Sequence, residues 1–285
     1  MRCMRSVTSA LIHTLCAFVL WPSWAHADVV SDWSTIAMNA AASSGRPVAR
    51  AAHDMAIVHV AVFETMNFVQ GGYVSRLLVR PSAAFRQPSE AAAAAAAHYV
   101  LEQLYPGLKV SFDAALEDSL AKIPDRQKAD GARLTGRAVG ANIYAILATG
   151  ETAGKTARAR FPENPEVSRA DVSAQRAEPA MQTWHSVVSL LAGSKRLRPI
   201  ETARLYALVF MAMSDVYAGM ESRPAAASRR CGSCTLDAAV LKILDSEFRT
   251  TGGAEVAVSR FKSEAAANLG ARIGKYALAH FAAAD

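Results

Sequence analysis

The sequence predicts an all-α protein, a bundle of many helices. Alanine is very abundant and runs of β-branched residues are scarce, a composition that favours helices. Apolar residues also recur at helical spacing in nearly every periodic segment, whereas no segment alternates in the manner of a half-buried strand. The length is suited to one large helical domain divided into two lobes.

Four regions follow from the pattern along the chain. Residues 1–27 are predicted to be a signal peptide, and residues 28–149 are predicted to form an N-terminal helical lobe. Residues 150–180 are rich in Gly, Pro, Thr, Arg and Glu and show no periodicity, so we expect an irregular connection. Residues 181–285 form the expected C-terminal helical lobe.

The first 27 residues have the features of a secretory signal. Arg2 and Arg5 precede an apolar run over Ala10–Trp21, and an A-x-A cleavage site ends at Ala27. We therefore expect a periplasmic or secreted protein. The apolar run is shorter than the roughly 20 residues that a spanning helix needs. No later segment is long and apolar enough either, so we expect no stable membrane span.

The charge of the chain argues against a nucleic-acid partner. Loss of residues 1–27 would remove two positive charges and leave a formal charge of +4 from the original +6. The remaining Lys and Arg are spread out, without long runs and without interleaved aromatics. The sequence identifies no partner, and both a homo-oligomer and a related partner protein are compatible with it.

The segment Arg50–Val69 is apolar nearly all round, which is typical of a central core helix. It nevertheless contains Asp54, His59, Glu64 and Asn67, polar groups that are costly to bury without partners. We expect a hydrogen-bonded core network of these four residues. The metal-ligand alternative is weaker, because the H-x-x-E spacing of such sites does not recur on a second helix.

The other expected helices share an apolar stripe of period 3.6. Ser89, with Glu90 behind it, is expected to cap the helix that contains the alanine tract Ala91–Ala97, whose small side chains allow close approach by a neighbour. The apolar stripe of the helix Leu108–Lys122 is expected to include Val110, and that of Arg126–Thr149 to include Leu134. The full set of helices expected from this stripe is Asp28–Asn39, Ser89–Leu104, Leu108–Lys122, Arg126–Thr149 (capped by Asp125), Met181–Ala192, Pro199–Gly219 and Glu255–Phe281.

The stretch Arg223–Phe248 places a basic loop before another helix. The helix is expected to start near Thr235, and its free backbone N–H groups and the positive end of its dipole would face Arg229 and Arg230. That geometry suits an oxyanion. An ordinary capped helix after a basic loop is the alternative.

Two cysteines remain once Cys3 and Cys16 leave with the signal. Cys231 and Cys234 form a C-x-x-C pair that an oxidising compartment would favour as a small disulfide; free thiols and a redox site are the alternatives. A thioredoxin-type role requires a preceding strand in a βαβ pattern, which we do not expect here. Zinc would require two more ligands, and no Cys or His follows until His280.

Three stretches of this chain resemble the exported bacterial proteins related to vanadium-dependent haloperoxidases and PAP2-type acid phosphatases. They are Trp33–Asn67, Ser89–Ala138 and Trp184–Phe281. The resemblance implies a multi-helix bundle of haloperoxidase/PAP2 type, shortened in its C-terminal half. The first two stretches bear on the fold, and the third bears on the chemistry.

In that family an anionic phosphate or vanadate is held by a Lys, an Arg-Pro pair, a turn containing His, and an Arg with a nearby His that is the nucleophile or metal ligand. Here no Lys lies between Lys195 and Lys242, and Val258 is near the position of the catalytic His. The resemblance therefore implies a degenerate site with no catalytic residue. We call the residues that match it the remnant anion-binding site: Arg223, Arg229, Arg230, Ser233 (in place of the first His) and Arg260.

No histidine lies between His185 and His280, where two catalytic imidazoles belong. His53, His59 and His98 could serve only if the fold brings them to the site. The leading hypothesis is a catalytically inactive protein with a binding or structural role and no cofactor. The alternative is a phosphate- or vanadate-dependent enzyme, of acid phosphatase or haloperoxidase type, with a rebuilt site. A redox module on the cysteine pair is a third hypothesis.

Overall fold

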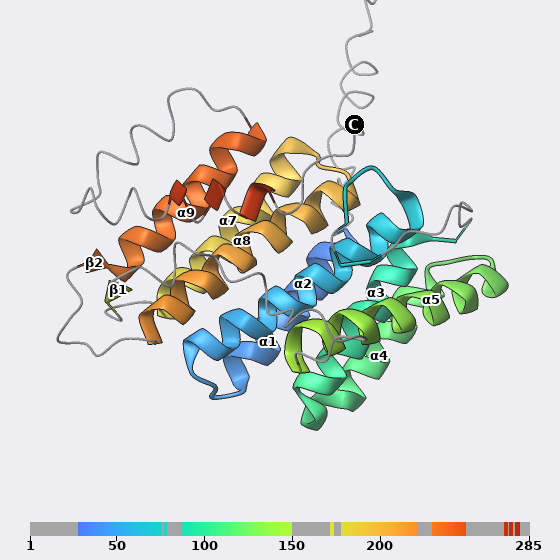
Figure 1. The fold of residues 1–285 in the computed structure, drawn as a ribbon. Coiled ribbons are helices and arrows are strands. Elements are labelled where there is room, and N and C mark those ends of the chain that lie inside the picture. Colours follow the sequence, from blue (N-terminus) through green and yellow to red (C-terminus); the bar gives the residue numbers. More distant parts are fainter. Residues whose placement is uncertain are drawn as a thin grey trace, which may run out of the picture.

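A computed structural model describes residues 28–75, 77–78, 87–149, 172–173, 178–221 and 230–248, with 271–272, 274–275 and 277–279 in a last helical segment. These residues confirm the all-α prediction (Figure 1). The elements are α1 (Val29–Ser43), α2 (Val48–Gln70), α3 (Ser89–Leu104), the 3₁₀ turn η1 (Pro106–Leu108), α4 (Lys109–Ala121), α5 (Arg126–Tyr144), the π-helical turn η2 (Ala145–Thr149), β1 (Val172–Ser173), α7 (Glu178–Lys195), α8 (Pro199–Glu221), β2 (Arg230–Cys231) and α9 (Gly232–Phe248).

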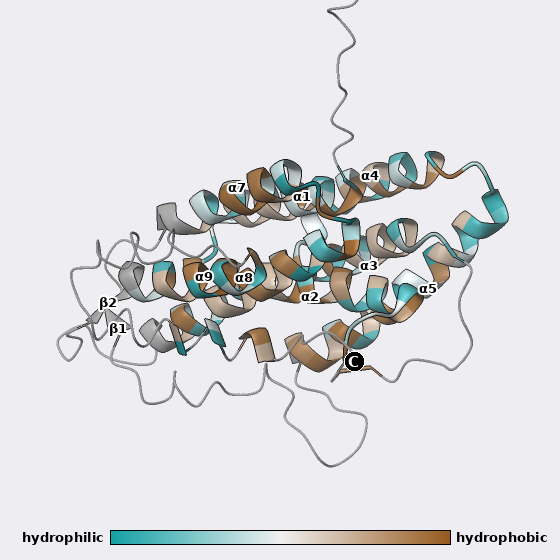
Figure 2. Cartoon of the chain, turned by 90° about the horizontal axis from the view of Figure 1, so that it is seen from above, coloured by the Kyte–Doolittle hydropathy of each residue, from teal (hydrophilic) through white to brown (hydrophobic). Residues whose placement is uncertain are grey.

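Helix α2 runs through the middle of the molecule, with α3, α4 and α5 on one side and α7, α8 and α9 on the other (Figure 1). Its residues are buried on all faces, as the sequence predicts for a central helix. One continuous hydrophobic core includes residues of α2 and of the helices on both sides. The outer helices α4 and α5 alternate between polar and apolar bands in Figure 2, which fits helices buried along one face.

The alanine tract of α3 lies in backbone contact with α5. Ala91–Ala97 are all buried. A Cβ atom added to Gly136 would lie 2.0 Å from the Ala92 carbonyl oxygen, and one added to Gly140 would lie 2.9 Å from the Ala96 carbonyl oxygen. The expected close approach is confirmed, and it depends on small residues on both helices.

Some local predictions were wrong. Ser89 does not cap α3, because Pro88 occupies the N-cap position and the Ser89 hydroxyl accepts a hydrogen bond from the Gln70 amide. Val110 and Leu134 are 82% and 69% exposed rather than internal. Each lies two residues from a buried position of its helix, Phe112 and Gly136, and two residues correspond to about 200° of rotation. Asp125 caps α5 as predicted, accepting from the Lys128 N–H at 3.1 Å.

Contrary to the prediction, a strand leads into the cysteine pair: Cys231 is the last residue of β2, and Cys234 lies in the first turn of α9. β1 and β2 pair in parallel, with Val172 opposite Arg230 and Ser173 opposite Cys231. Helix α9 then begins at Gly232, three residues earlier than predicted. Two-residue strands carry no periodicity, which is why the sequence did not reveal them. Among the described helices, none has the length and apolar content needed to cross a bilayer.

Candidate functional site

The remnant anion-binding site is described only at one end. Arg223, Arg229 and Arg260 lie outside the described residues. The backbone of Arg230 and Ser233 is described, at the junction of β2 and α9, but their side chains are not. The same holds for Cys231 and Cys234, so both the arginine clamp and the disulfide stay predictions.

Every histidine of the described helices contacts a polar side chain on another helix. His53 Nδ1 lies 3.2 Å from Ser214 Oγ on α8, and His98 Nε2 lies 2.7 Å from Asp113 Oδ1 on α4. His59 of α2 and His185 of α7 instead share one group, as described next. All four rings are therefore engaged between helices.

Ser34 of α1 lies between the two imidazoles. Its Oγ is 3.3 Å from His59 Nε2 and 2.9 Å from His185 Nε2. His59 also stacks against the rings of both Tyr206 and Phe210, with ring centroids 4.8 Å apart in each pair. Burial, followed by the nearby His185, holds the pKa of His59 well below its usual value, and burial lowers that of His185. Because Ser34 is only 1% exposed, its hydroxyl is not accessible as a nucleophile.

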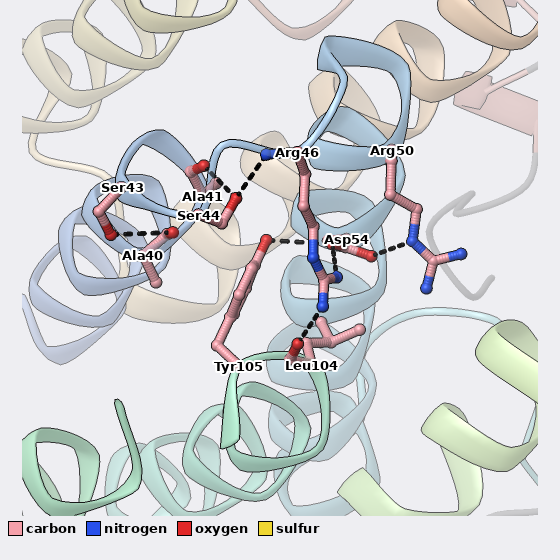
Figure 3. Close-up of polar contacts among 9 residues, drawn as sticks. All are labelled: Ala40, Ala41, Ser43, Ser44, Arg46, Arg50, Asp54, Leu104 and Tyr105. Atoms are coloured by element: carbon pink, nitrogen blue, oxygen red, sulfur yellow. Dashed lines mark hydrogen bonds and ion pairs between the residues drawn. The ribbon is translucent and has the colours of Figure 1, made fainter. Parts of the chain in front are cut away.

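Asp54 of α2 is fully buried within a cluster of charged and polar groups (Figure 3). Its carboxylate pairs with Arg46 at 2.5 Å and with Arg50 at 3.1 Å, and it accepts from the Tyr105 hydroxyl at 3.1 Å. The Arg46 guanidinium also donates to the Leu104 carbonyl and lies 4.6 Å from the centre of the Tyr105 ring. The cluster satisfies the buried charge and joins the α1–α2 turn to the end of α3.

A cavity of about 370 Å³ between α3, α4 and α5 is lined by charged residues, most of which pair with one another, while Arg137 lies over the Tyr99 ring. Lys109 bridges Asp113 at 2.9 Å and Glu102 at 3.1 Å. Hydrogen bonds from His98 and Lys109 hold the pKa of Asp113 below its usual value. On α5, Arg133 pairs with Glu117 at 2.7 Å. This arrangement favours a structural role over an anion site.

Glu64 departs from the predicted core network. It is 1% exposed, and neither carboxylate oxygen has a hydrogen-bond partner of normal geometry among the described residues. The network prediction holds for Asp54, for His59 and for Asn67, whose amide exchanges two 3.0 Å hydrogen bonds with the Tyr73 backbone. For Glu64 it was wrong.

The Glu64 carboxyl borders a cavity of about 140 Å³, the Glu64 cavity, lined by Glu64, Asn67, Phe68, Tyr73, Ser75 and Leu78. Burial raises the pKa of Glu64 to about 7, and the nearby Ser75 hydroxyl lowers it by less. Such a group changes charge near neutral pH, which is a property of functional carboxyls. The sequence shows a glutamate in an apolar helix, but it does not show that the carboxylate lacks hydrogen-bond partners.

A scan against protein-family models and searches of curated proteins and of solved structures each find no match to this chain. The resemblance to haloperoxidases and phosphatases therefore rests on the sequence motifs alone. Within the described residues, no group of three or more His, Cys, Asp or Glu side chains could hold a metal ion.

Proposed function

We propose that the protein is an exported, helical protein of the haloperoxidase/phosphatase type that has lost catalysis and acts by binding. The motifs of the third resembling stretch support the ancestry, since Arg223-Pro224 and the turn over Cys231–Cys234 keep their order. Ser233 and Val258 in place of the two histidines support the loss of chemistry. The signal-like residues 1–27 support export to the periplasm or beyond.

The positions of the histidine side chains are the main support for the proposed loss of catalysis. A phosphoryl or peroxovanadate site requires an imidazole that reaches the bound anion as nucleophile, ligand or proton carrier. The chain offers no histidine between His185 and His280. His53, His59, His98 and His185 are engaged with side chains of α8, α1 and α4. Burial also lowers the pKa of His53, as it does for His59 and His185.

The proposal is tested by assaying the purified protein for phosphatase activity and for halide oxidation, with and without vanadate. We expect rates equal to a no-enzyme blank, because loss of a catalytic imidazole and of the cation clamp each costs orders of magnitude in rate. Weak phosphate binding without turnover agrees with the proposal.

The alternative, a phosphate- or vanadate-dependent enzyme with a rebuilt site, makes the opposite prediction. It requires saturable turnover that disappears in Arg223→Ala and in Ser233→Ala. Arg126→Ala is the matched control, because Arg126 is an exposed arginine at the start of α5. Turnover lost in the first two variants and kept in the third would overturn the proposal.

A further inference from the structure

The Glu64 carboxyl is a buried acid without a cation. A buried carboxylate must either take up a proton or pair with a positive charge, because its desolvation is otherwise too costly. Asp54, the other buried acid of the described residues, pairs with two guanidinium groups. No described charged group contributes to the pKa of Glu64. The charge of an ionised Glu64 must therefore be balanced by a proton or by a cation from outside the described groups.

The chain folds back to build the walls of the cavity. Helix α2 ends at Gln70, and Gly71 and Gly72 reverse the chain with φ of 76° and 111°. Asn67 then fixes Tyr73 against α2 through the paired backbone hydrogen bonds. Phe68 lies one turn beyond Glu64 and hence on the same side of α2. Phe68, Tyr73, Ser75 and Leu78 are half-buried, so the cavity opens toward solvent.

The lining favours an organic cation over a metal ion. Two aromatic rings and a leucine stand beside one carboxylate, which is the combination that recognises alkylammonium groups through charge pairing and cation–π contact. Ca²⁺ needs six to eight oxygen ligands. Here Glu64 supplies the one carboxylate, and the Asn67 carbonyl oxygen already accepts the Tyr73 N–H. A cavity of about 140 Å³ admits an amine of a few carbon atoms.

The surrounding charge supports the same ligand. The C-terminal end of a helix carries partial negative charge, and the last turn of α2 has no basic residue to offset it. Arg204 of α8 lies 5.2 Å from the centre of the Tyr73 ring and brings positive charge to that wall, but its ion pair with Glu247 of α9 offsets this charge.

We propose that the Glu64 cavity binds a small organic ammonium ion, with the Glu64 carboxylate as counter-ion and the rings of Phe68 and Tyr73 in contact with its alkyl groups. The proposal gives a ligand class to the binding role proposed above, but it does not depend on the loss of catalysis. The carboxylate and the remnant anion-binding site are read out by separate assays.

The test is a titration of the full chain with methylammonium and tetramethylammonium, followed by ligand-detected NMR at constant ionic strength in amine-free buffer. The neutral tert-butanol is the matched probe for tetramethylammonium. We expect saturable binding of the cations, at least tenfold weaker in Glu64→Gln and unchanged in Asp118→Asn, which alters an exposed carboxylate of α4. Equal binding by wild type and Glu64→Gln, or equal binding of tert-butanol, would overturn the proposal.

The pH dependence gives a second readout. Proton and cation compete for Glu64, so wild-type affinity should rise as pH increases through about 7 and level off above it, while Glu64→Gln should show no such rise. Tyr73, Arg198, Arg204, Glu201 and Glu247 are the charged or titratable groups on the Tyr73 side, and both proteins contain them. Parallel pH profiles in the two proteins would contradict the assignment.

A variant of the wall tests the ligand class without touching the carboxylate. Phe68→Leu should weaken tetramethylammonium binding more than methylammonium binding, because the ring contacts the methyl groups. Preferential binding of Ca²⁺ by the wild type would overturn the ammonium assignment. Failure of all ammonium binding, with turnover still absent, would overturn this inference and leave the proposed function standing; turnover together with ammonium binding would do the reverse.

Discussion

Replacing Glu64 by Gln should make the protein more stable at alkaline pH and not at acid pH. Burial raises the pKa of Glu64 from 4.5 to about 7. Each pKa unit corresponds to about 1.4 kcal/mol, so ionising Glu64 in the folded state costs on the order of 3 kcal/mol. Because the folded pKa lies above the unfolded one, the stabilisation that comes from keeping Glu64 protonated is fully present below pH 4.5. It is lost as pH rises through about 7.

The measurement is urea unfolding of wild type, Glu64→Gln and Asp118→Asn at pH 4.5, 6, 7 and 8, in sodium buffers without amines. An amine buffer would supply the proposed cation and hide the effect. The buried amide of the variant carries its own cost, which is independent of pH and cancels when the difference between variant and wild type is compared across pH. A difference that stays constant from pH 4.5 to 8 would refute the argument that Glu64 ionises without a partner.

Three further predictions concern other parts of the chain. N-terminal sequencing of the exported protein should find Asp28 as its first residue, and an uncleaved chain in the cytoplasm would contradict the export proposal. Double substitution of Cys231 and Cys234 by Ser should lower the melting temperature only slightly, since a two-residue loop gains little from closure; ligand binding lost in a folded double variant would favour the redox hypothesis. Gly136→Ala should destabilise the protein by roughly 1–3 kcal/mol or more, because the new Cβ would lie 2.0 Å from a carbonyl oxygen of α3. Gly193→Ala in α7 meets no atom within 4 Å and should be neutral or stabilising by up to about 1 kcal/mol.

Periodicity was sufficient for the described helices, because each has an apolar face that the core requires; the predicted helix Glu255–Phe281 lies mostly outside the described residues. Periodicity identified α2 as central from its all-round apolar character, and the alanine tract of α3 indicated the close packing against α5 that the structure shows. It placed Val110 and Leu134 inside wrongly, since a helix with few large apolar residues admits more than one rotation.

The contacts of Ser34 and the isolation of Glu64 could not be predicted from the sequence, because both depend on tertiary structure. Ser34 is 25 residues from His59 and 151 from His185, so no local pattern connects them. The isolation of Glu64 depends on the path of residues 71–78, which two glycines set by backbone angles rather than by side-chain pattern. Polar residues in a core helix can be recognised from sequence, but which of them lacks a partner is decided by tertiary structure.

The single hydroxyl of Ser34 also imposes an order on the protons of its two neighbours. A hydroxyl has one proton, so when Ser34 donates to the Nε2 of one imidazole, a hydrogen bond from the other ring must run in the opposite direction. The tautomers of His59 and His185 are therefore linked through one oxygen. Since His59 Nδ1 has no hydrogen-bond partner among the described residues, the ring that solvent reaches, His185, selects the tautomer of a ring that solvent does not reach. A proton on the Nε2 of His185 would make that atom a donor to Ser34, which leaves the Ser34 hydroxyl to donate to His59 Nε2 and the His59 proton on Nδ1.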